Sequence, residues 1–347
     1  MSDRKPVHYS DYLQLDKILN AQLPESDKEK LEAHDEMLFI IIHQAYELWF
    51  KQLAYDLDSV IKLVSTPAIN DNSPAMQTVV HRLNRMGTIL RVLVHQIDIL
   101  ETMTPLDFLD FRDLLRPASG FQSWQFKLFE GRLGLKFENR HGQEYYISQL
   151  RPAEVELIKN SESQPSLLDL INAWLSRMPF FNDASLWKEF KTQHEPIPDM
   201  HPFWSEYKQV YASTLLEAEK GNLSAFDELF ISENPQRSLS AAANRTALFI
   251  LLYRGFPLLQ QPFQLIQQLL EIDEQMATWR FRHVNMVHRM IGGRVGTGGS
   301  TGKEYLQGAL QKHYVFKDFA ILTSFLIPRT KLPELGTALQ NKLGFTS

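Results

Sequence analysis

Two histidines of the sequence stand among large apolar residues, where a polar ring needs a bonding partner. His43 directly follows the run MLFIII, and on a helix it shares one face with Phe39, Tyr46 and Phe50. Because that run covers almost the whole circumference of its helix, we expect a helix buried on nearly all sides and an interior His43. The ring can then bond a backbone carbonyl or Glu47, or it can serve a ligand or a metal ion in an aromatic pocket.

His283 lies in a second apolar stripe, on a helix expected over residues 264–291. The stripe advances in steps of three and four residues and consists of Ile272, Met276, Trp279, His283, Met286 and Met290. His288 lies about 140° further round that helix, among Arg and Asn residues, and is expected at the surface. His43 and His283 could face one flat metal cofactor or belong to two unrelated cores, and their spacing leaves both possibilities open.

Arg112 falls on the apolar side of a short helix that Pro105 can open. It shares that side with Phe108, Phe111 and Leu115. A buried guanidinium without an anion is costly. Arg112 should therefore pair either with an internal carboxylate or with the carboxylate of a bound ligand.

The glycine-rich stretch GGRVGTGGSTGKEYL follows the helix of His283 and invites comparison with nucleotide-binding loops. The comparison fails, because Glu304 rather than Ser or Thr follows Lys303, and Thr301 replaces the third glycine of a dinucleotide motif. Either loop should also follow a strand, whereas a helix is expected here. The backbone and the hydroxyls of Thr297, Ser300 and Thr301 could approach a ligand, or the stretch could simply end the helix.

Helical periodicity dominates the sequence and predicts an all-α fold with at most a minor hairpin. Only residues 135–148, LKFENRHGQEYYIS, could form short strands around a turn at RHGQ. Pro196, Pro198 and Pro202 predict a surface loop. We expect one domain over residues 1–347, with a helical subregion of unassigned role at 138–235. Helices are expected near residues 36–64, 75–100, 121–133, 166–178, 205–219, 240–254 and 264–291.

The composition limits the classes of partner. The 347 residues are 44% apolar and 22% charged, which is typical of a globular protein. A formal net charge of -5 gives no electrostatic reason to expect a nucleic acid or an anionic membrane as partner. Cysteine is absent, which excludes disulfides, thiolate metal ligands and a cysteine nucleophile. The start has no apolar signal core and no apolar run is long enough to span a membrane, so we expect a soluble cytoplasmic protein.

Four blocks of the sequence, taken in order, closely resemble signature blocks of the tryptophan 2,3-dioxygenase family. The blocks are HDEMLFIIIHQAYELWFKQ, FRDLLRPASGFQSWQF, WRFRHVNMVHRMIG and GTGGSTGKEYL. The N-terminal YSDYLQLD is also similar to a family motif, with Ser10 in place of the usual glycine. The resemblance covers roughly residues 7–134 and 240–330, and the stretch from about 138 to 235 carries no motif of the family.

The resemblance implies a haem-dependent dioxygenase that converts L-tryptophan and O2 into N-formyl-L-kynurenine, the first step of the kynurenine pathway. It implies that His283 is the axial ligand to the ferrous iron of haem b and that Ser119 lies near a haem propionate. His43 would accept the indole N–H as an orienting group more than an obligatory base, Arg112 would hold the substrate carboxylate, and Thr297 would contact both charged groups of the substrate. The N-terminal segment 1–30 would reach a neighbouring subunit of a homotetramer. The further substrate-site residues that the resemblance implies are Phe39, Ile40, Ile41, Ile42 and Phe108, with Tyr9, Tyr12 and Leu13 from the neighbouring subunit.

Two alternatives stay open on the sequence. The first is a haem enzyme of the same superfamily that acts on a modified indole, which would keep His283 and change the substrate-pocket residues. Phe39, His43, Arg112 and Thr297 all follow the family pattern. The second is a non-catalytic helical protein that binds haem or tryptophan, and an assay of the reduced protein with tryptophan and O2 separates it from an enzyme.

Overall fold

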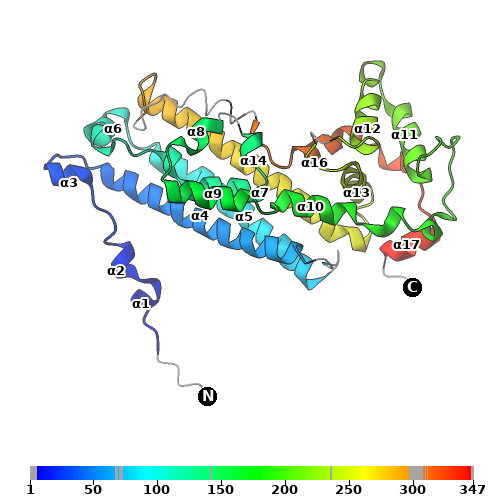
Figure 1. The fold of residues 1–347 in the computed structure, drawn as a ribbon, viewed down its shortest axis with the longest axis horizontal. Helices are drawn as coiled ribbons and strands as arrows, with labels where there is room; N and C mark the ends of the chain where they lie inside the picture. The colour runs from blue at the N-terminus through cyan, green and yellow to red at the C-terminus, as the bar shows by residue number, and fades with distance from the viewer. Residues whose placement is uncertain are drawn as a thin grey trace.

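The computed structural model describes residues 6–66, 69, 73–140, 143–234, 237–296, 308, 310 and 312–344. Within these ranges the regular elements are all helices, which confirms the all-α expectation. Three long helices, α4 (Glu36–Val64), α5 (Pro74–Leu100) and α14 (Pro257–Ile291), run side by side along the molecule (Figure 1). α5 packs against both α4 and α14, so the three form the frame of the fold. None of the described helices combines the length and apolar character that crossing a membrane requires.

Local capping explains where the long helices begin. Pro74 and Pro257 occupy the first turns of α5 and α14, where a missing N–H costs nothing. Ser73 also caps α5 by accepting the N–H of Met76 at 3.2 Å. The helix expected over 264–291 therefore begins earlier, at Pro257, and tolerates Pro262 within its first two turns.

Shorter helices close the frame near α4 and α14. α6 (Pro105–Arg112) begins with a capping box, in which Thr104 and Asp107 each accept the other's backbone N–H. α7 (Trp124–Leu133) packs against α4 and against α9 (Pro152–Glu162). The helix expected from residue 121 begins at Trp124, because Gly120–Gln122 form a separate 3-10 turn, η2.

The other helices build an aromatic part of the core around the start of α14 (Figure 1). They are α10 (Leu167–Ser176), α11 (Pro202–Thr214), α12 (Asn222–Phe230), α13 (Ala241–Leu252), α16 (Lys317–Ile321) and α17 (Thr337–Leu343). The irregular chain before Pro202 agrees with the expected proline-rich loop. One continuous cluster of buried side chains joins this part to the long helices. The division of the chain into domains stays a prediction.

The hairpin considered at residues 135–148 is wrong. Phe137–Asn139 form a 3-10 turn, η3, and Gln143–Ser148 form a helix, α8. An isolated hairpin has little stability in water. The helical path instead buries Tyr146, whose carbonyl accepts Lys127 Nζ at 2.5 Å and whose ring lies 3.8 Å from the Arg140 guanidinium.

α4 is less buried than the run MLFIII predicts. Ile42 faces the core with 4% exposure, whereas Ile41 is 47%, Leu48 56% and Tyr55 72% exposed. His43 is correspondingly half-buried rather than fully interior. The apolar residues of α4 thus lie on two faces, one packed in the core and one exposed to solvent. The expectation of a helix buried on nearly all sides is wrong for the single chain.

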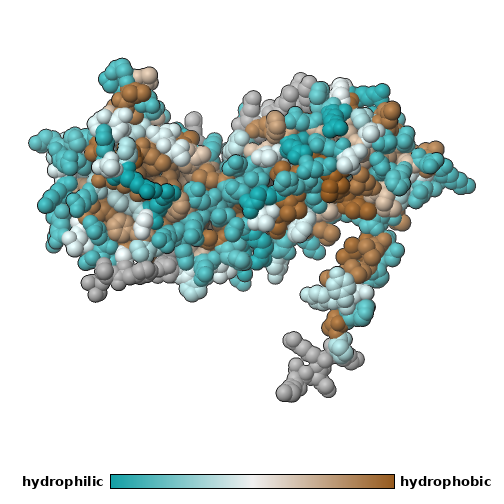
Figure 2. Space-filling model, turned by 180° about the vertical axis from the view of Figure 1, so that it is seen from behind, coloured by the Kyte–Doolittle hydropathy of each residue, from teal (hydrophilic) through white to brown (hydrophobic). Residues whose placement is uncertain are grey.

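The N-terminal helices α1 (Tyr9–Leu13), α2 (Leu15–Ile18) and α3 (Glu25–Glu29) form an arm that leaves the body of the molecule (Figure 1). Figure 2 shows apolar side chains along this arm. Tyr9 is 70% and Tyr12 75% exposed. Glu36 fixes the base of the arm by accepting the backbone N–H groups of Glu25 and Ser26 at 2.8 and 2.9 Å.

Candidate functional site

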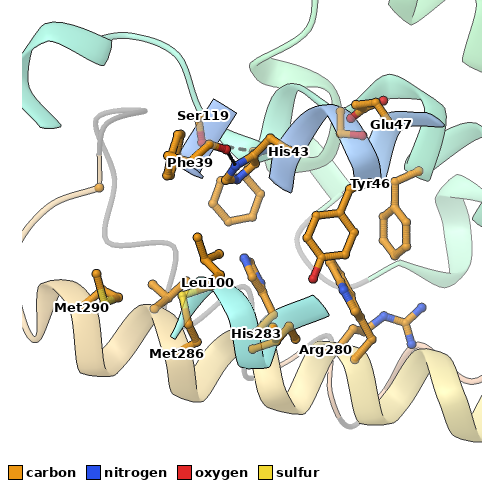
Figure 3. A pocket seen from close by; sticks show the side chains of 18 of the residues that line it. Phe39, His43, Tyr46, Glu47, Leu100, Ser119, Arg280, His283, Met286 and Met290 are labelled. Carbon is orange, nitrogen blue, oxygen red and sulfur yellow. Dashed lines mark hydrogen bonds between the residues drawn. The ribbon is translucent and has the colours of Figure 1, made fainter. Parts of the chain in front are cut away.

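A cavity of about 300 Å³ lies between α4, the end of α5, the segment of α6 and α7, and α14. Figure 3 shows side chains from α4 and α14 pointing into it from opposite sides. The polar groups that line it are few against the apolar ones, which is typical of a site for a largely apolar ligand. Its apolar wall includes Phe39, Tyr46, Phe50, Ile97, Leu100, Met103, Phe108, Phe121, Phe126, Trp279, Met286, Val287, Met290 and Ile291.

His43 and His283 line this same cavity, so the structure brings the two stripe histidines together. His43 points inward from α4 and His283 from α14, and the rings approach each other across the space (Figure 3). His288, one turn further along α14, is exposed as expected. The possibility of two unrelated cores is therefore excluded.

His43 is held as a neutral hydrogen-bond acceptor. Its Nδ1 lies 2.7 Å from the carbonyl oxygen of Phe39, one turn earlier, so Nδ1 carries the proton and donates. Burial lowers the pKa of His43, although the Phe39 bond and the Glu47 charge oppose the shift. Glu47 itself accepts Gln125 Nε2 at 2.7 Å. In the neutral ring, the second nitrogen, Nε2, is free to accept a hydrogen bond. His43 can therefore bond the Phe39 carbonyl and a ligand at the same time.

His283 is placed as a neutral imidazole on an apolar floor. Its ring stacks on that of Trp279, with centroids 5.1 Å apart and planes 4° from parallel. Burial, assisted by His43, lowers the pKa of His283 to about 4. A neutral imidazole is the form that binds a metal ion.

Arg112 provides a buried cation without an ion-pair partner in the described part of the chain. Its side chain is 4% exposed, and its Nη2 donates to the carbonyl of Val295. No carboxylate of the described residues forms a salt bridge with it, and its buried Nε has no hydrogen-bond partner there. The internal ion pair is thus not found, and the cost of an unpaired buried charge favours an anionic ligand.

Aromatic rings surround the space between Arg112 and His43. Phe39 and Phe108 stack with centroids 5.7 Å apart, and the Phe39 ring lies 4.1 Å from that of His43. Ser119, at the start of η2, also lines the cavity and caps the turn by accepting the Phe121 N–H at 3.3 Å. The sequence resemblance assigns Phe39 and Phe108 to the substrate pocket and Ser119 to a haem propionate, and the structure brings all three residues to one cavity.

The sequence did not single out four polar residues that line the inner end of the cavity, the charged Lys127, Glu130 and Arg280 and the imidazole of His313. Glu130 accepts Arg280 Nη2 at 2.6 Å, although the two residues are 150 positions apart. The only sequence signal is the three-residue spacing of Lys127 and Glu130, which places both on one helical face. Leu100, Met103 and Ser123 are further cavity residues that the sequence did not single out, and Glu47, considered only as a partner of His43, also lines the cavity.

Several of the expected site residues lie elsewhere in the single chain. Ile40, Ile41 and Ile42 are not among the residues that line the cavity, because they point to other faces of α4. Tyr9, Tyr12 and Leu13 belong to the arm, away from the cavity. Thr297 lies outside the described residues, next to Gly296, which lines the cavity.

The chain is similar to known proteins over nearly its whole length. A family model described as Tryptophan 2,3-dioxygenase matches residues 2–326. The chain is 42% identical to the tryptophan 2,3-dioxygenase of Bdellovibrio bacteriovorus and 43% identical to that of Alteromonas mediterranea, over 98% of both chains in each case. It is 41% identical to that of Xenopus laevis, over 96% of this chain and 86% of the relative. The similarity also spans residues 138–235, where the sequence shows no family motif.

Proposed function

The chain belongs to the tryptophan 2,3-dioxygenase family, and on that basis we propose that it opens the indole ring of L-tryptophan with O2 to give N-formyl-L-kynurenine. The observation that carries the proposal is one aromatic cavity lined by a buried guanidinium and two neutral imidazoles. Tryptophan is a zwitterion with a large ring, so its site needs a cation, aromatic walls and an acceptor for the indole N–H. Arg112, Phe39, Phe108 and His43 supply these groups.

The proposed cofactor is haem b, and the donor set of the cavity fits it. His283 would hold its iron through a neutral imidazole nitrogen, and the apolar wall would contact its flat ring. Ser119 and Ser123 offer hydroxyls for its acidic side chains, and the buried Oγ of Ser123 has no partner among the described residues. When bound, ferrous haem supplies the iron at which O2 is activated.

The residues of this chain then bind and orient the substrate. Arg112 grips the carboxylate with two parallel N–H groups, as guanidinium groups do with carboxylates. Phe39 and Phe108 would form one wall of the indole pocket and exclude water from the reacting carbons. Thr297 would contact the charged end of the substrate, and this role stays an expectation.

His43 orients the substrate by accepting the indole N–H at Nε2. Since Phe39 fixes the proton on Nδ1, the ring presents a lone pair and no positive charge to the indole. The indole N–H is a weak acid, so the bond serves to align the ring more than to remove the proton. We therefore expect His43→Ala to reduce turnover without abolishing it, and complete loss of turnover with normal substrate binding would contradict this role.

The proposal includes assembly and place in metabolism. We propose a homotetramer in which Tyr9, Tyr12 and Leu13 of the arm complete the cavity of a neighbouring subunit. The exposure of both tyrosines and of the α4 residues Ile41 and Leu48 supports contacts between copies. The reaction would be the first step of the kynurenine pathway, in a cytoplasmic enzyme without cysteine.

A visible spectrum and an activity assay test this function together. The purified protein should show a Soret band that shifts when L-tryptophan is added, and the reduced protein with O2 should produce N-formyl-L-kynurenine, followed by its absorbance. His283→Ala should lose the Soret band, whereas the control His288→Ala, on the exposed side of α14, should keep it. A His283→Ala protein with its full haem content would refute the axial assignment, and a haem protein that leaves tryptophan unchanged would refute the activity.

A further inference from the structure

The inner end of the cavity carries more buried positive than negative charge. We call Lys127, Glu130, Arg140 and Arg280 the inner charge cluster. Their exposures are 6%, 3%, 5% and 7%, so all four are withdrawn from water. The cluster contains three cations and one carboxylate. The binding of tryptophan described above uses none of them.

Glu130 holds the two arginines in place. Its Oε1 accepts Arg280 Nη2 and its Oε2 accepts Arg140 Nη1, each at 2.6 Å. Burial alone would raise the pKa of Glu130, but Arg140 and Arg280 outweigh it and hold the pKa at about 2. The carboxylate is therefore charged throughout the physiological range, and it offsets about one of the two guanidinium charges.

Lys127 is the cation without a carboxylate bonded to it in the described part of the chain. Its Nζ donates to the carbonyl of Tyr146 at 2.5 Å, and no salt bridge of the described residues includes it. Glu162 lies at the edge of the cluster, with a carboxylate oxygen 4.0 Å from Arg140 Nε, and burial raises the pKa of Glu162.

Asp273, which is 5% exposed, also interacts electrostatically with Arg280, and burial raises the pKa of Asp273 to about 6. Neither Glu162 nor Asp273 lines the cavity, whereas Lys127, Arg280 and Glu130 do, so the inner end of the cavity wall keeps one positive charge in excess. Burial lowers the pKa of Lys127 to about 8, so its amine is still mostly charged at neutral pH.

The inner charge cluster shares its cavity with the imidazole of His283. Lys127, Glu130 and Arg280 line that cavity, and Arg280 precedes His283 by one turn of α14 (Figure 3). In a water-poor interior, a unit charge acts on a neighbouring group one helical turn away far more strongly than it does in water. Any redox group held by His283 therefore lies within the field of the cluster.

We propose that the inner charge cluster raises the reduction potential of the cofactor held by His283 and so favours its ferrous state. The inference rests on the proposed haem. Ferric haem takes one electron from a one-electron reductant, so its charge falls by one unit, and positive surroundings stabilise the product. The acidic side chains of the cofactor offset part of the field, but a change of one charge in the cluster still shifts the potential in a defined direction.

Two substitutions of opposite charge test the proposal on the haem-loaded protein. Lys127→Met removes a positive charge and should lower the midpoint potential, whereas Glu130→Gln removes a negative charge and should raise it. The potential is measured by reductive titration with a redox dye, followed at the Soret band. Lys208→Met and Asp227→Asn are matched controls, because they remove the same charges from an ion pair of 2.6 Å between α11 and α12, outside the cavity. Both controls should leave the potential unchanged.

Opposite shifts separate an electrostatic role from a structural one, since simple loosening of the site would move both variants in the same direction. Shifts of the same sign, or no shift in either variant, would overturn the proposal. If Glu130→Gln fails to fold, Lys127→Met and the charge-keeping Lys127→Arg decide alone: only the first should lower the potential. A wild-type protein without a Soret band would instead refute the proposed cofactor, so the two failures are distinguishable.

Discussion

The charged residues of the cavity differ in whether a group of opposite charge is bonded to them. Glu130 lies between two guanidinium groups at 2.6 Å each, so its charge is already paired within the protein. Arg112 is as deeply buried but bonds only the Val295 carbonyl in the described part of the chain. A carboxylate ligand would supply the anion that Arg112 lacks, whereas Glu130 already has two cationic partners.

Replacing Arg112 should therefore damage substrate affinity much more than replacing His43. Loss of a buried charge-assisted contact costs about 2–5 kcal/mol, which is on the order of a 30-fold loss of affinity or more. Loss of the neutral bond to His43 costs nearer to about 1 kcal/mol. We expect this ranking for Arg112→Ala and His43→Ala in tryptophan titrations of the haem-loaded proteins.

Arg116→Ala is the matched control for that comparison. Arg116 pairs with Asp113 at the surface, at 3.1 Å, with both side chains more than half exposed. Its replacement should leave tryptophan affinity unchanged. Equal losses for Arg112→Ala and His43→Ala would show that the carboxylate is bound elsewhere.

Between elements, Glu130 joins α7 to α14, and its titration should appear in the stability of the fold. The pKa of Glu130 in the folded protein, about 2, is below its ordinary value of 4.5, so the folded state binds this proton less readily than the unfolded state. The stabilisation is complete above pH 4.5 and is lost as the pH falls toward 2. Its size is about 3 kcal/mol, from about 1.4 kcal/mol per pKa unit.

Urea unfolding at pH 5 and pH 3 measures this contribution. Wild type should lose more stability between the two pH values than Glu130→Gln, which lacks the titrating group and should be less stable at pH 7. Glu217→Gln, at an exposed pair with Lys220, should behave as wild type. Parallel pH dependence in Glu130→Gln and wild type would contradict the assignment.

The join between α7 and α10 depends on one glycine. Gly134 ends α7 at φ +142°, and a Cβ there would lie 2.8 Å from Leu168 Cβ and 3.1 Å from Val315 Cγ1. Both the backbone conformation and the space favour glycine. Gly134→Ala should lower the free energy of unfolding by about 2 kcal/mol or more.

Gly221→Ala is the control for this substitution in urea unfolding experiments. No heavy atom lies within 4 Å of the Cβ that it would add, so we expect little change in stability. If both alanine variants unfolded at the same urea concentration, close packing at Gly134 would not be the reason for its glycine.

The long elements could be predicted from the sequence because helical periodicity and capping are local properties. The stripe through His283 and the proline at position 105 are examples, and both give elements close to those observed. The pair of Glu130 and Arg280 could not be predicted, because it joins positions 150 residues apart. The hairpin at 135–148 failed because Tyr146 finds its partners, Lys127 and Arg140, only in the folded chain.

At the scale of the whole molecule, two groups of exposed apolar side chains bear on assembly. The arm exposes Tyr9 and Tyr12, and the long helices expose Ile41, Leu48 and Tyr55 on α4, with Val92 and Ile99 on α5. Monomeric proteins seldom expose many large apolar side chains together. The proposed homotetramer would cover both surfaces and would give the arm a cavity to complete.

Complementation between two defective variants tests the shared site. A chain without residues 1–24 lacks the helices α1 and α2, and Arg112→Ala lacks the carboxylate anchor; each should have little activity by itself. Mixed oligomers from co-expression should regain activity, because the arm of an Arg112→Ala chain can complete the intact cavity of a truncated one. Activity no greater than the sum of the two separate variants would show that the arm serves its own chain.

The length of α14 also fixes the separation between two parts of the cavity. It carries the imidazole of His283 and, eight positions later, ends at Ile291, shortly before the carbonyl of Val295 that holds Arg112. At a rise of about 1.5 Å per residue, that stretch spans about 12 Å. The helix α14 would thereby limit the distance between the reacting ring of the substrate and the carboxylate bound by Arg112. If His283 holds the cofactor and Arg112 the substrate carboxylate, as proposed, we expect amino acids with a longer or shorter side chain to fit poorly even after the cavity walls are changed.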